Sequence, residues 1–133
     1  MVSRTATSTA PPAAAWALLA RPDQWQRWAP HLRGAWGLAG ADGTVRDGAR
    51  GAARLLGAVP VPVTITAVEP GRAWSWRVAG VVDMDHVVDA VPGGCRVTVT
   101  IAAPGPLEAA LHATYGPLVE ALIGRLARIA AKP

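Results

Sequence analysis

The sequence has no phenylalanine, one tyrosine and one cysteine, although 51% of its 133 residues are hydrophobic. Because Cys95 stands alone, the chain has no internal disulfide, and we expect a small buried side chain rather than a reactive thiol. No uncharged apolar run is long enough to span a membrane. The opening Met-Val-Ser-Arg is not followed by the apolar core of a signal peptide. These absences predict a cytoplasmic protein without a membrane segment.

Lysine is nearly absent as well, with one lysine against twelve arginines and a net charge of +4. The arginines are scattered singly along the chain, whereas a phosphate footprint normally clusters them. We therefore expect no nucleic acid partner.

Familiar catalytic motifs are also missing. The chain has no nucleophile elbow, no phosphate-cradling glycine loop, no paired inward carboxylates and no Cys/His cluster. We expect no metal and no cofactor. Any catalysis has to rest on positioning a substrate in an apolar pocket beside one or two polar groups.

Tryptophan takes the place of phenylalanine, with six residues in the chain. Each indole offers a flat apolar face and an N–H that needs a partner when buried. Two interpretations stay open: the tryptophans fill the core, or some of them line a cavity for a flat hydrophobic ligand.

Residues 106–131 carry the strongest periodicity. Apolar residues recur there at steps of three and four, which predicts a helix with one apolar stripe. The stripe consists of Leu107, Leu111, Leu118, Leu122, Leu126 and Ile129. The helix would be roughly 39 Å long, against a domain diameter of about 28 to 36 Å, so it must cross the whole body and cover a sheet. We expect a kink at Gly116-Pro117, because Pro117 cannot bond the carbonyl of Ala113.

The rest of the chain predicts one strand, two short helices and six further strands. The first helix is expected at residues 13–20, and the second carries Trp25 and Trp28. The strands are expected at residues 3–9, 32–38, 44–55, 61–69, 72–78, 81–91 and 96–102. This order predicts an α+β fold with a curved antiparallel sheet of about seven strands around the long helix.

Several motifs resemble a known family. The run Trp16-x-Leu-Leu-Ala-Arg-Pro-Asp-Gln-Trp25-Gln-Arg-Trp28-Ala-Pro is similar to the opening of the polyketide cyclase/dehydrase branch of the START-like (SRPBCC) superfamily. The further motifs are Gly48-Ala-Arg-Gly51, Val61-Pro-Val, Glu69-Pro-Gly-Arg-Ala-Trp74-Ser-Trp76, His86 and Gly105-Pro-Leu-Glu. The resemblance implies a single helix-grip domain over residues 1–133, with a deep cavity for apolar small molecules between sheet and helix. Because the superfamily includes aromatase/cyclases, carriers and hormone receptors, the fold does not fix the function.

Asp83-Met84-Asp85-His86 suggests a metal site, but strand alternation argues against it. Asp83, Asp85 and Asp89 share one face, and His86 lies on the opposite, apolar face. His86 is then either a core histidine satisfied by a neighbour or a cavity residue that bonds a ligand carbonyl. Without an inward carboxylate, burial should lower its pKa.

Other polar residues near the expected cavity give weaker signals. Tyr115 is expected to turn its hydroxyl inward, and His112 to lie at the helix flank. Arg46, Arg50 and Arg54 alternate onto one strand face. We favour an outward position, paired with acids of other strands, over a cavity cation, because buried unpaired arginine is rare.

The sequence therefore favours a protein that binds a small hydrophobic, aromatic, polycyclic or lipid-like ligand. The expected ligand-binding residues are Trp28, Trp74, Trp76, Met84, His86, Leu111, Tyr115 and Leu118. The alternative is a polyketide cyclase-like enzyme that cyclises and dehydrates a poly-ketone, with His86 as the candidate catalytic residue, assisted by Tyr115. An interaction module that uses surface tryptophan is a third, less favoured class.

Overall fold

The computed structural model describes residues 2–55 and 59–132. Seven antiparallel strands form one sheet in the order β1-β7-β6-β5-β4-β3-β2. The strands are β1 (Val2–Ser8), β2 (Leu32–Trp36), β3 (Arg50–Leu55), β4 (Pro60–Glu69), β5 (Ala73–Val78), β6 (Val82–Val91) and β7 (Gly94–Ala102). The helices are α1 (Pro12–Ala20), the single-turn η1 (Pro22–Gln24), α2 (Trp25–Trp28), α3 (Gly105–Thr114) and α4 (Gly116–Ala130).

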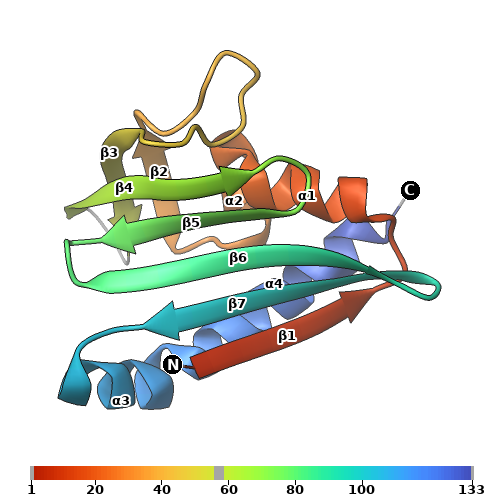
Figure 1. Cartoon of the computed structure of the whole chain (residues 1–133). Helices are drawn as coiled ribbons and strands as arrows, with labels where there is room; N and C mark the ends of the chain where they lie inside the picture. The colour runs from red at the N-terminus through yellow and green to blue at the C-terminus, as the bar shows by residue number, and fades with distance from the viewer. Residues whose placement is uncertain (1, 56–58, 133) are drawn as a thin grey trace.

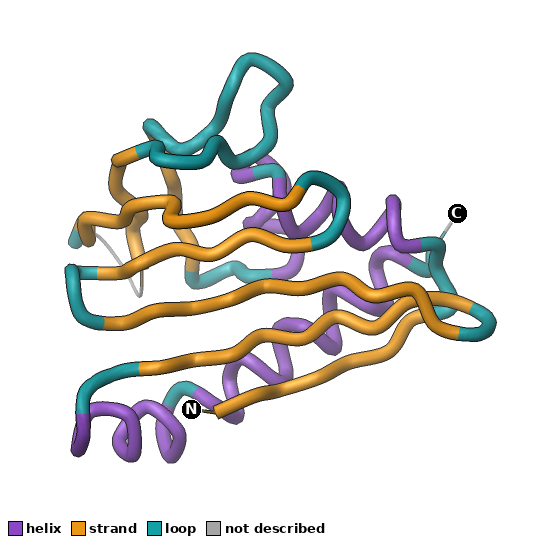
Figure 2. Tube along the Cα trace, viewed as in Figure 1, coloured by secondary structure: helices purple, strands orange, loops and turns teal. Residues whose placement is uncertain are grey.

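The elements form two layers. Helix α4 runs across one face of the curved sheet, and α1 and α2 cover the same side near the end of α4 (Figures 1 and 2). Ser8 ties the first strand to the helix, because its hydroxyl donates a hydrogen bond of 2.7 Å to the carbonyl of Ala127. The predicted α+β helix-grip architecture is confirmed. Within residues 2–55 and 59–132, no helix has the length and apolar character needed to cross a membrane.

The C-terminal helix is interrupted near the expected point. Tyr115 separates α3 from α4, with φ −96° and ψ −28°. Pro117 follows two residues later, and its ring disfavours regular helix in the turn before it. We therefore attribute the break to this proline.

The predicted apolar stripe is confirmed only in part. The buried residues of α4 are Gly116, Val119, Ile123, Leu126 and Ala127, and no described residue of α3 is buried. Only Leu126 of the predicted stripe is among them, and Leu107 is 39% exposed. Leu111, Leu122 and Ile129 are half-buried and pack against the core. The buried face of α4 is therefore centred about one residue further along the helix than the predicted leucines, at Val119 and Ile123.

One strand prediction also needs correction, and β4 contains an irregularity. Residues 44–49 are not a strand, since β3 begins at Arg50. This segment bonds the end of α1 instead, because the Val45 amide donates to the Ala20 carbonyl at 2.9 Å. In β4, Ile65 is buried and Ala67 is exposed, because the pairing of β4 with β5 shifts register between these two residues. A bulge of this kind reverses the side-chain alternation beyond it.

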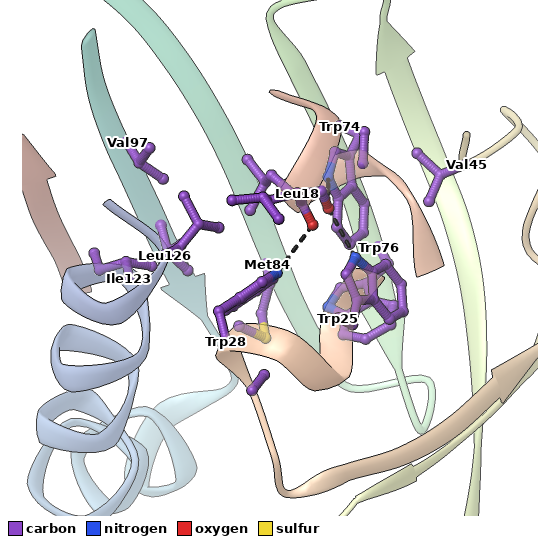
Figure 3. Packing of buried hydrophobic residues seen from close by; sticks show 14 of the residues in the cluster. Leu18, Trp25, Trp28, Val45, Trp74, Trp76, Met84, Val97, Ile123 and Leu126 are labelled. Atoms are coloured by element: carbon purple, nitrogen blue, oxygen red, sulfur yellow. Dashed lines mark hydrogen bonds between the residues drawn. The ribbon is translucent and has the colours of Figure 1, made fainter. Parts of the chain in front are cut away.

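Three tryptophans close the C-terminal end of α1 (Figure 3). The last carbonyls of a helix have no partner within it. Trp28 donates its indole N–H to the Leu18 carbonyl at 2.9 Å. Trp25 and Trp74 both donate to the Leu19 carbonyl, at 2.8 and 3.1 Å. These buried indoles therefore satisfy both their own polar groups and the helix end, which explains why tryptophan suits these positions.

Candidate ligand cavity

A small cavity lies between the sheet and α4. Its volume is about 40 Å³, which is room for a few water molecules. The lining comes from the α2–β2 segment, from three central strands and from the beginning of α4. The lining residues are Trp28, Ala29, His31, Leu32, Trp76, Met84, His86, Val99, Tyr115, Val119, Leu122 and Ile123.

Five of the eight predicted ligand-binding residues line this cavity: Trp28, Trp76, Met84, His86 and Tyr115. The other three do not. Trp74 lies between the rings of Trp25 and His86, whereas Leu111 and Leu118 are half-buried on α3 and α4, outside the lining. Ligand contact by any of the eight residues stays a prediction.

His86 points inward from β6, opposite the three aspartates, as strand alternation predicts. Its ring stacks on Trp74 with centroids 3.8 Å apart, and its Nδ1 lies 3.1 Å from the Trp74 carbonyl oxygen. A carbonyl only accepts, so Nδ1 carries the proton and Nε2 is left as an acceptor. Burial lowers the pKa of His86 to about 4, against smaller opposing effects of the Trp74 carbonyl and the Asp85 charge. The ring is therefore neutral. Its Nδ1 and one of its faces are already engaged by Trp74 in the core.

Trp76 supplies a donor with no partner. Its side chain is 5% exposed and lines the cavity. Its Nε1 is buried without a hydrogen-bond partner among the described residues. An indole N–H only donates, and leaving such a group unpaired costs roughly 1–3 kcal/mol. This position therefore calls for an oxygen acceptor.

The cavity holds a histidine that sequence reasoning missed. His31 Nε2 lies 3.3 Å from the Tyr115 hydroxyl, and His31 Nδ1 is a buried atom without a partner among the described residues. Burial lowers the pKa of His31. His31 follows Pro30 in the turn before β2, where no periodicity indicates which way a side chain points. The one sequence feature that could have drawn attention to His31 is that the chain contains three histidines in all.

Tyr115 is expected to keep its proton in alkaline solution. Burial raises the pKa of its hydroxyl to about 12. Because the chain contains a single tyrosine, phenolate absorbance reports this group directly. In the folded protein the absorbance should stay low at pH 10, where the same tyrosine in urea is about half ionised. Equal titration of the folded and unfolded chains would show that the hydroxyl is open to water.

Charged side chains lie outside the cavity. Arg46, Arg50 and Arg54 are exposed, in agreement with the favoured interpretation, but within the described residues none of the three forms an ion pair with an acid of another strand. Arg54 lies over the Trp36 ring at 5.7 Å. The pairs on the outer face join Arg72 to Glu69 and Asp89, and Arg77 to Asp83. His112 is exposed on α3 and lies 3.2 Å from Arg4 Nη2. In the described part of the chain, no three His, Cys, Asp or Glu residues are grouped as metal ligands would be.

Comparison with known proteins establishes the family. Residues 1–131 match the family model described as "Polyketide cyclase / dehydrase and lipid transport". The chain belongs to this family. The START-like resemblance seen in the sequence motifs is thereby confirmed. No curated protein matches the chain significantly.

Solved structures show the same fold at low sequence identity. Protein MLL2253 from Mesorhizobium loti has a TM-score of 0.77 and 14% identity over 96% of this chain and 94% of its own. Ara h 8.0201 has a TM-score of 0.72 and 14% identity over 97% and 95%. DynU16, a putative protein in the dynemicin biosynthetic locus, has a TM-score of 0.72 and 19% identity, with 96% of this chain aligned to 45% of DynU16. This member of the family thus has a helix-grip fold.

Proposed function

We propose that this protein binds a small hydrophobic molecule carrying at least one oxygen, in the cavity between the sheet and α4. The supporting observation is the pair of unpartnered buried atoms, Trp76 Nε1 and His31 Nδ1, on residues that line an otherwise largely apolar cavity. A ligand oxygen offers Trp76 the acceptor it lacks. The apolar lining provides the hydrophobic contribution to binding.

Ligand entry requires the cavity to widen. Small-molecule pockets usually measure about 300–1,000 Å³, and this cavity measures about 40 Å³. The segment best suited to move is α3 with Tyr115, since no described residue of α3 is buried. Segments with few buried apolar contacts open at low cost. Displacement of α3 with Tyr115 breaks the 3.3 Å contact of Tyr115 with His31 and the 3.2 Å contact of His112 with Arg4, and it moves the tyrosine ring away from the cavity that it lines.

The family description is in keeping with this proposal, since it names lipid transport beside cyclase and dehydrase activity. A binder or carrier is favoured because His86 already bonds the Trp74 carbonyl and stacks on its ring. The proposed location is the cytoplasm, as expected from the lone Cys95.

A cyclase is the second candidate, and one observation favours it. Three titratable side chains, His31, His86 and Tyr115, surround the same cavity. The free Nε2 of neutral His86 is able to accept a proton from the carbon beside a ketone. The Tyr115 hydroxyl is able to donate a hydrogen bond to the developing enolate oxygen. In this case the bound poly-ketone is enolised before it cyclises.

Replacement of Trp76 by phenylalanine tests the proposed site. We expect naphthol to bind the wild-type protein and to bind Trp76→Phe several-fold more weakly, because one buried hydrogen bond is worth about 1 kcal/mol. The measurement is isothermal titration calorimetry. Trp16→Phe is the matched control, because Trp16 packs against the core but does not line the cavity. Equal weakening in the two variants, or no binding of naphthol to the wild type, would contradict the proposal.

A further inference from the structure

A second hollow lies on the other side of the Leu32 side chain. It is an open groove of about 490 Å³ along β2, bounded by η1, α2 and the loop after β2. Its walls are rich in glycine and carry Trp36, which is 48% exposed. The lining residues are Pro22, Asp23, Trp25, Gln26, Leu32, Gly34, Ala35, Trp36, Gly37, Leu38, Ala39 and Gly43.

The Leu32 side chain forms part of the wall of the groove and part of the wall of the cavity. Among the described residues, it is the one that lines the groove and also the cavity. Its side chain is buried, with 7% exposed. It begins β2, an edge strand of the sheet, at a register irregularity between Leu32 and Gly34. An edge strand is paired on one side only, so a change at Leu32 disturbs fewer neighbours than a change in a central strand.

The cavity and the groove have complementary properties for binding a ligand. The cavity contains polar atoms suited to one functional group but is far too small for a ring system. The groove has the volume of a ligand pocket, but it is open along β2 and presents a flat tryptophan face. We propose that groove and cavity are two ends of one binding site divided by Leu32, which takes an elongated, planar, neutral molecule with a hydroxyl head. This inference rests on the proposed function.

The polar atoms of the cavity select the head group. Trp76 offers an N–H donor, and His86 offers the unprotonated Nε2 as an acceptor. The two rings are in edge-to-face contact, with centroids 6.0 Å apart, and both line the cavity. A hydroxyl group both accepts and donates, so it satisfies both. A carboxylate only accepts, and the described lining contains no arginine or lysine to offset its charge.

The planar body of the molecule then extends past Leu32 into the groove. There the Trp36 ring offers a surface for stacking, and the missing side chain of Gly34 leaves room beside the backbone. In the wild-type protein the Leu32 side chain has to rotate aside for the ligand to pass. Shortening that side chain should therefore make binding easier.

Three leucine-to-alanine variants distinguish removal of the wall between groove and cavity from enlargement of one of the two hollows alone. Leu32→Ala removes the shared wall, Leu38→Ala enlarges the groove alone, and Leu122→Ala enlarges the cavity alone. The probe is hydroxyanthracene, titrated by calorimetry, with melting curves for every variant. We expect Leu32→Ala to bind it at least about tenfold more tightly than the wild type. Leu38→Ala and Leu122→Ala should stay within about twofold.

Two further measurements complete the test, one with a smaller substitution at Leu32 and one with a charged probe. Leu32→Val removes less volume and should give a smaller gain in the same direction, even if Leu32→Ala does not fold. Anthracene carboxylate should bind Leu32→Ala at least about tenfold more weakly than hydroxyanthracene. Equal gains in all three alanine variants, or none in Leu32→Ala and Leu32→Val, overturn the shared site. Naphthol binding that depends on Trp76 would then still stand, so failure of the partition is distinct from failure of the proposed function.

Discussion

Replacement of Trp74 by alanine is expected to lower the free energy of unfolding by about 3–5 kcal/mol, the usual cost of truncating a buried large aromatic residue. Trp74 is 2% exposed. Its ring stacks on Trp25 with centroids 5.5 Å apart and on His86 with centroids 3.8 Å apart. Its N–H also reaches the Leu19 carbonyl. Alanine removes both stacks and leaves a cavity in the centre of the core.

The matched control is Trp36→Ala. Trp36 is 48% exposed, and its described ring contact is with the Arg54 guanidinium at 5.7 Å, an interaction worth about 0.5–1 kcal/mol at an exposed site. Urea unfolding followed by circular dichroism measures both variants. A loss of stability in Trp74→Ala no larger than in Trp36→Ala would mean that the tryptophan stack does not hold the fold together.

Stability is expected to fall as the pH drops from 7 towards 4, in part through His31, whose pKa burial also lowers, and in part through His86. Burial keeps the folded ring neutral down to a pKa of about 4, whereas the unfolded ring takes up a proton at its ordinary pKa of 6.5. The unfolded state therefore binds more protons between these values, and protonation favours unfolding. At 1.36 kcal/mol per unit, the contribution of His86 amounts to about 3 kcal/mol and levels off below pH 4.

His86→Leu isolates this effect. The variant loses the Nδ1 hydrogen bond and the stack on Trp74, so its stability at pH 7 should fall by about 1–2 kcal/mol. Between pH 7 and 5, however, it should lose clearly less stability than the wild type. His112→Leu, which removes an exposed imidazole from α3, is the matched control for the loss of a histidine. If His86→Leu and the wild type show the same pH dependence, the buried neutral histidine is not its source.

Much of the fold was predicted from the alternation of side chains along the strands. Period two placed Met84, His86 and Val88 on the inner face of β6 and the aspartates outside, and the sheet follows that register. The order of strands and helices was sufficient for the α+β class. The helical stripe was right only in part, because the buried face of α4 is centred on Val119 and Ile123, and the predicted Leu122 and Ile129 lie half-buried beside it. Period two also does not predict the bulge in β4, which leaves Ala67 exposed two residues after the buried Ile65.

The candidate site was predicted only in part, because its shape depends on packing. Pattern alone did not show that Trp25 and Trp74 would stack and fill the space under the sheet, which leaves a cavity of about 40 Å³. His31 lies in a turn, and Leu32 lies at an irregular strand start. At such positions the alternation of side chains along a strand does not predict which way a side chain points. Their importance comes from contacts between segments far apart in the chain, such as the 3.3 Å approach of His31 to Tyr115.

Native mass spectrometry of the protein purified gently from its own host tests the central claim most directly. We expect a mass increment from a small, mainly apolar molecule that is released on denaturation. Trp76→Phe prepared in the same way should carry less of it, because the unpartnered indole N–H is the proposed anchor. Wild-type protein that carries no small molecule, or equal loading of wild type and Trp76→Phe, would contradict binding at this cavity.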